Sequence, residues 1–194
     1  MIHIILFLSF TRETYRLGDG YFGLLSKGAE KDIIKKYPNS ILSEYLSKKQ
    51  DSHNMNQTLM MSIINRTCKN YEYPPNPYTA IHLRTGDVVC GTRWHEIKKR
   101  PHSISYYNKY RNDTAVYIFS KPFFSVHSSK PCVKESNEYT RKVLKVTNGK
   151  LFNNKNADHA LCTMVKANKF VLGKGYFSKT IEELNKKYRS YNHF

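Results

Sequence analysis

Three short apolar runs constrain the fold of this chain more than any other feature. They span residues 78–83 (YTAIHL), 114–119 (TAVYIF) and 169–172 (KFVL), and each contains the β-branched or aromatic residues that are typical of buried strands. Segments with helical periodicity lie between and after them. This alternating order predicts the α/β class, with a parallel sheet covered by helices on both faces.

The helical segments carry apolar residues at three- and four-residue spacing. They occupy residues 136–144, 157–167 and 178–189, and residues 143–146 are an alternative short strand. Ser178 is suited to cap the last of these helices.

The first part of the chain has a different character. Residues 29–36, 41–49 and 58–68 show helical spacing, with Ser40 as the expected cap of the second helix. Residues 71–77 (YEYPPNP) hold three of the seven prolines, so they predict a rigid connector. We therefore expect two domains: a reduced α/β segment formed by residues 1–75, and the sheet domain formed by residues 76–194.

Residues 1–10 (MIHIILFLSF) bear on the compartment of the protein. They are fewer than the roughly 18 apolar residues that a membrane-spanning helix needs. No Lys or Arg precedes them and no small-residue cleavage site follows, so a buried first strand is favoured over a signal or anchor remnant. The prediction is a cytoplasmic protein without a transmembrane segment, and a secretory or Golgi lumen is the alternative if residues 1–10 are a remnant signal.

The cysteines and the glycosylation sequons change this prediction little. The four cysteines are isolated, and they fit neither a zinc site nor a dense disulfide framework. Asn56, Asn65 and Asn112 each begin an N-x-Thr sequon, which matters only if the chain enters a secretory lumen.

The charge of the chain favours an anionic partner without specifying one. Lys and Arg number 32 against 15 Asp and Glu, and the formal charge of +17 attracts nucleic acid, anionic membrane or a phosphorylated small molecule. The basic residues occur in pairs and short clusters, as on solvated helix faces. An aromatic content of 13% excludes a disordered basic tail. A basic nucleic-acid-binding protein remains an alternative, but no RNP-like, helix-turn-helix or zinc signature supports it.

The residues that are best suited to chemistry follow the first apolar run. Alternation along a strand places His82 and Arg84 on the same side at its carboxyl end, where ligands of parallel sheets bind. The guanidinium group of Arg84 offers a rigid fork of donors that suits a phosphate. Asp87 is placed to hold that guanidinium group or to meet a substrate hydroxyl. The alternative is a local salt bridge between Arg84 and Asp87, with His82 as a core histidine.

Residues 82–87 (HLRTGD) resemble the H-x-R-x-[GT]-D motif of the fucosyltransferase superfamily, the enzymes of the GT-B type that include α-1,2-, α-1,6- and protein O-fucosyltransferases. A second similarity lies nearer the carboxyl terminus, in Asp158, residues 167–171 and residues 175–178. The two motifs occur in the family's order.

The resemblance implies a Rossmann-like donor domain, GDP-fucose as the donor substrate, no cofactor or metal, and a glycan or protein acceptor on the side of residues 1–75. Transfer would invert the anomeric centre, with Arg84 stabilising charge on the departing GDP. A catalytically inactive relative that binds a GDP-sugar is an alternative. The catalytic residues that the resemblance and the residue types suggest are Arg84, Asp87 and Glu96, the last two as candidate bases. The substrate-binding residues are His82, Gly86, Ser120, Asp158, Gly175, Phe177 and Ser178.

Overall fold

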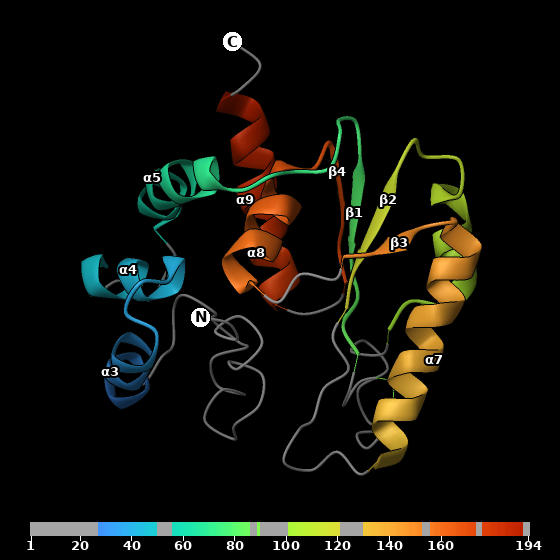
Figure 1. Cartoon of the computed structure of the whole chain (residues 1–194), viewed down its shortest axis with the longest axis horizontal. Helices are drawn as coiled ribbons and strands as arrows, with labels where there is room; N and C mark the ends of the chain where they lie inside the picture. The colour runs from blue at the N-terminus through green and yellow to red at the C-terminus, as the bar shows by residue number, and fades with distance from the viewer. Residues whose placement is uncertain are drawn as a thin grey trace.

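A four-stranded sheet forms the centre of the molecule (Figure 1), as a computed structural model shows for residues 27–49, 56–85, 89, 101–120, 130–152, 156–173 and 176–191. The strand order is β3-β2-β1-β4, and every neighbouring pair is parallel. The predicted α/β class is therefore confirmed. The strands are β1 (Thr79–His82), β2 (Val116–Phe119), β3 (Lys150–Leu151) and β4 (Lys169–Val171).

Helices account for most of the remaining described residues. Ser40 caps α4 as predicted, since its side chain accepts a hydrogen bond from the backbone N–H of Ser43 at 3.0 Å. Helix α7 runs through residues 143–146, so the alternative strand there is wrong. The α-helices are α3 (Lys27–Lys36), α4 (Ile41–Lys48), α5 (Gln57–Thr67), α7 (Lys130–Thr147), α8 (Ala157–Lys166) and α9 (Tyr176–Tyr191), and the 3-10 helices are η1 (Cys68–Asn70) and η3 (Ile104–Tyr110).

The side chains of β1 alternate between two cores. Ala80 is buried in a cluster with residues of α8, α9 and the helices α3–α5. Ile81 and Leu83 are buried on the other side, with residues of η3 and α7. Because successive strand residues point to opposite faces, one apolar run fills both cores, and helices cover both faces of the sheet.

Helices α3–α5 lie against the α8 and α9 side of the sheet (Figure 1). Tyr45 and Met60 of this helical layer are fully buried in the same cluster as Leu161 and Leu184. The described residues before the connector are helical, and the predicted first strand, residues 1–10, lies outside the described residues. The two-domain division stays a prediction.

The order of the strands reverses beside β1. From β1 the chain passes to β2 and then β3 on one side, and it returns to β4 on the other side of β1. In open α/β sheets, ligands bind outside the carboxyl ends of the strands at such a reversal. The edge where β1 and β4 end is therefore the first place to look for a site. None of the helices in the described ranges is both long and apolar enough to cross a membrane.

Candidate functional site

Strand β1 and helix α9 meet at the carboxyl edge of the sheet. Nδ1 of His82, the last residue of β1, lies 2.6 Å from Oγ of Ser178 in the first turn of α9. The ring of Phe177 packs edge-on against the imidazole, with the ring centres 5.2 Å apart. Three of the predicted substrate-binding residues, His82, Phe177 and Ser178, are thus in contact although His82 and Phe177 are 95 positions apart in the sequence.

His82 is neutral at physiological pH. Burial, and secondly the positive charge of Arg84, lower the pKa of its imidazole to about 4. A neutral imidazole has one donor and one acceptor nitrogen, so the contact with Ser178 satisfies Nδ1 in either tautomer. This geometry matches the alternative of a satisfied core histidine, and it makes His82 a residue that positions its neighbours.

Gly173 allows the close approach of β4 to β1 at this edge. A Cβ atom at this position would clash with the carbonyl oxygen of His82 and would lie 3.0 Å from its Nδ1. Only glycine fits between the two strand ends without displacing the His82 backbone. Gly173 was not among the predicted site residues, although the glycines of residues 173–175 mark the loop.

Helix α9 begins at Tyr176, two residues earlier than predicted. Ser178 is therefore not the cap; it lies in the first turn, 1% exposed, with its hydroxyl directed to His82. The backbone N–H groups of the first helical turn have no partner within the helix, and the positive end of the helix dipole lies there. The first turn of α9 thus offers donors and positive potential to an anion at the strand reversal.

Arg84 brings a full positive charge to the same edge. It follows β1 by two residues, is half-buried, and lies close enough to His82 to lower the pKa of that imidazole. Thr85 beside it is 1% exposed, so the chain directly after Arg84 is packed inside the protein. An arginine and a helix N-terminus at neighbouring strand ends can bind a diphosphate between them.

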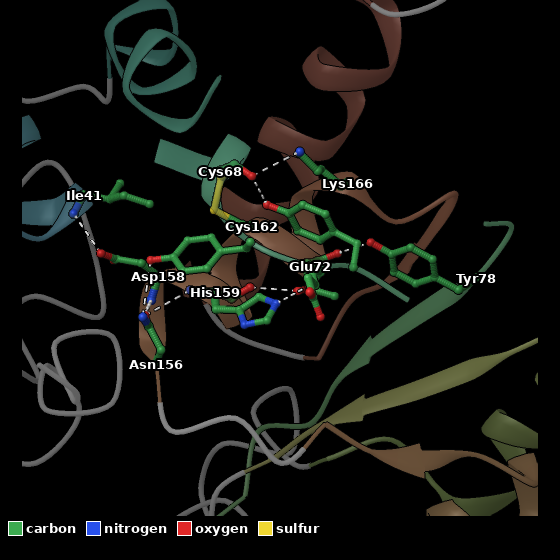
Figure 2. The surroundings of a disulfide bond; sticks show 12 residues. Ile41, Cys68, Glu72, Tyr78, Asn156, Asp158, His159, Cys162 and Lys166 are labelled. Atoms are coloured by element: carbon green, nitrogen blue, oxygen red, sulfur yellow. Dashed lines mark hydrogen bonds between the residues drawn. A yellow bond between two sulfur atoms is a disulfide. The ribbon is translucent and has the colours of Figure 1, made fainter. Parts of the chain in front are cut away.

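Ser120 and Asp158 form hydrogen bonds with residues outside this cluster. Ser120 follows β2, and its Oγ lies 2.9 Å from Oγ1 of Thr140 in α7. Asp158 lies in the first turn of α8, and one of its carboxylate oxygens accepts a hydrogen bond of 3.3 Å from the backbone N–H of Ile41, the first residue of α4 (Figure 2). Burial raises the pKa of the Asp158 carboxyl to about 6, because desolvation outweighs this hydrogen bond.

The remaining predicted site residues cannot be placed. Gly86, Asp87, Glu96 and Gly175 lie outside the described residues. Within the described ranges, no group of His, Cys, Asp and Glu side chains could hold a metal ion. The cluster that the structure brings together is therefore His82, Arg84, Phe177 and Ser178, with Gly173 beneath it.

Sequence reasoning missed a disulfide. Cys68 of η1 is bonded to Cys162 of α8, with Cα atoms 5.6 Å apart and 94 positions of separation along the chain (Figure 2). Both cysteines are fully buried. Nζ of Lys166 and the hydroxyl of Tyr73 both donate to the carbonyl oxygen of Cys68. The bond fastens the helical layer to α8, and no sequence spacing signals such a pairing.

The chain was also compared with known proteins. No family model matches it, and no curated protein or solved structure matches it either.

Proposed function

We propose that this protein is a glycosyltransferase that binds GDP-fucose and transfers fucose to a glycan or protein acceptor. The observation that carries the proposal is that His82 contacts Ser178 in the first turn of α9 and lies close enough to Arg84 to feel its charge, so that both positive groups lie near the end of β1, at the reversal of strand order. Such a pair of positive groups suits a diphosphate, and the parallel sheet suits the nucleotide attached to it. The motif of residues 82–87 supports fucose as the sugar through its resemblance to fucosyltransferases.

In the proposed reaction, the chain stabilises a leaving group rather than forming a covalent intermediate. Negative charge develops on the diphosphate as its bond to the sugar breaks. Arg84 and the N–H groups of α9 neutralise that charge in the transition state. His82 fixes the first turn of α9 through Ser178, so that these donors are in place before the donor substrate binds. Asp87 and Glu96 remain the candidate bases for the acceptor hydroxyl.

Thermal unfolding with nucleotides tests the proposal. GDP and GDP-fucose at millimolar concentration should raise the Tm of the full chain, because a ligand that binds only the folded state stabilises it. Arg84→Ala should remove the shift. Arg141→Ala is the matched control, since it removes the same charge from an exposed position on α7. No shift with either nucleotide would overturn the proposal.

Release of GDP from GDP-fucose, followed by mass spectrometry with a panel of glycans, then separates an active enzyme from an inactive relative. Turnover that Arg84→Ala abolishes supports transfer. Binding of GDP-fucose with neither hydrolysis nor transfer would show a sugar-nucleotide-binding protein instead.

A further inference from the structure

The disulfide indicates the environment in which this chain folds. Cys68 and Cys162 are fully buried and bonded, and their Cα separation of 5.6 Å lies in the usual range for such bonds. Disulfides form and persist in oxidising compartments, whereas cytosolic reductants keep thiols reduced. The bond joins two segments of one core, so it forms as part of folding rather than as a surface modification.

Two sequons lie on the surface of the same molecule. Asn65 is exposed on α5, a helix that buries Met60, Ile63 and Ile64. Asn112 is exposed in the turn between η3 and β2. Within the described part of the chain, neither amide side chain has a hydrogen-bond partner, so an attached glycan would displace no contact.

Asn112 lies at the end of the sheet opposite to the candidate site. Its neighbour Asp113 accepts hydrogen bonds from the side chains of Thr79 and Lys169, the first residues of β1 and β4. These residues mark the amino ends of the strands, whereas Arg84 and α9 lie at the carboxyl ends. A glycan on Asn112 therefore leaves the site open.

We propose that this chain folds in an oxidising secretory compartment and carries N-linked glycans on Asn65 and Asn112. This proposal does not rest on the proposed function, and it differs from the expectation of a cytoplasmic protein.

Two covalent steps are involved. The thiols of Cys68 and Cys162 lose two protons and two electrons to a disulfide oxidoreductase, which is reduced to its dithiol form. Each asparagine Nδ2 then forms a bond to the first carbon of an oligosaccharide, loses a proton, and displaces a lipid diphosphate, the carrier of that oligosaccharide.

The experiment expresses the full chain in eukaryotic cells in two forms, behind a cleavable secretion leader and in the cytosol. Thr67→Ala and Thr114→Ala remove the sequons while keeping both asparagines. Thr67→Ser and Thr114→Ser are the matched controls, because serine preserves a sequon. The readouts are the gel mobility before and after peptide N-glycosidase, and a peptide map without reductant.

The secreted chain should contain the peptide that links Cys68 to Cys162, and each Thr→Ala change should remove one glycan that the Thr→Ser change retains. The cytosolic chain should be reduced at these cysteines and should unfold at a lower temperature. A folded secreted chain that lacks glycans at both asparagines would overturn the proposed glycosylation. An equal Tm for a reduced cytosolic chain would overturn the proposed requirement for an oxidising compartment.

Discussion

Nδ1 of His82 lies 2.6 Å from Oγ of Ser178, and this contact joins the carboxyl end of β1 to the first turn of α9. This hydrogen bond therefore helps to hold the first turn of α9 at the end of β1, two residues before Arg84. Because the imidazole is buried and neutral, the contact does not depend on charge above a pH of about 4, the pKa of His82.

Ser178→Ala should lower the free energy of unfolding by about 1–3 kcal/mol, the usual cost of leaving a buried polar group without its partner. Urea denaturation at pH 7 measures it. Ser190→Ala, at an exposed position in the last turn of the same helix, is the control and should change stability by less than about 0.5 kcal/mol. Equal effects of the two changes would show that the contact with His82 does not stabilise the fold.

Gly173→Ala should lower both stability and nucleotide binding. The added methyl group meets the backbone of His82, which cannot rotate away, so the ends of β1 and β4 must separate. We expect a loss of about 1–3 kcal/mol in the free energy of unfolding and a loss of the thermal shift with GDP.

Gly149→Ala provides the comparison for that experiment. Its Cβ would meet Oγ1 of Thr147 at 2.8 Å and the carbonyl oxygen of Val116 at 3.2 Å, near the amino ends of β2 and β3. This variant should lose stability but keep the GDP response. If Gly173→Ala also kept the full response, the site would not lie between β1 and β4.

Removal of the disulfide by the double change Cys68→Ala and Cys162→Ala should lower the free energy of unfolding by about 2–5 kcal/mol, because the bond closes a long loop in the unfolded chain. Urea denaturation of the two proteins under non-reducing conditions measures the difference. Coincident unfolding curves would contradict a stabilising role for the bond.

The Asp158→Asn variant should gain stability relative to the wild type as the pH rises. The pKa of Asp158 is raised to about 6 in the folded protein, so the folded state disfavours the ionised carboxylate. Below a pH of about 4 the carboxyl is protonated in both states. Between about pH 4 and 6 the unfolded chain ionises first, and the wild type loses stability over this interval and stays less stable above it.

The amide oxygen that the Asp158→Asn change introduces can still accept the N–H of Ile41, so the variant removes the charge and keeps the acceptor. Partial exposure of Asp158 reduces the expected difference between pH 4 and pH 7 to about 1–2 kcal/mol. Urea denaturation at pH 4, 5, 6 and 7 tests it. A difference between the two proteins that does not vary with pH would show that ionisation of Asp158 costs no stability.

The sequence predicts those parts of the fold whose side chains are buried on both faces. The runs at residues 78–83 and 114–119 become β1 and β2, with boundaries within two residues. By contrast, β3 was not predicted because Lys150 and Leu151 are exposed and pair only through their backbone. A strand of this kind leaves no hydrophobic pattern to detect.

The site was predicted only in part, for a similar reason. His82 and Ser178 were both singled out, but their contact depends on the packing of α9 against β1, which no local pattern encodes. Ser178 has the residue type of a cap, and this led to a helix start two residues too late. The disulfide likewise depends on where η1 meets α8 in space.

The bond between Cys68 and Cys162 spans the proline-rich connector of residues 71–77. A protease that cut the connector once would not release either fragment, because the bond holds the chain together on both sides of the cut. The nicked protein would run as a single species on a non-reducing gel and as two on a reducing gel. The connector is thus a place where the chain can be opened without dividing the molecule.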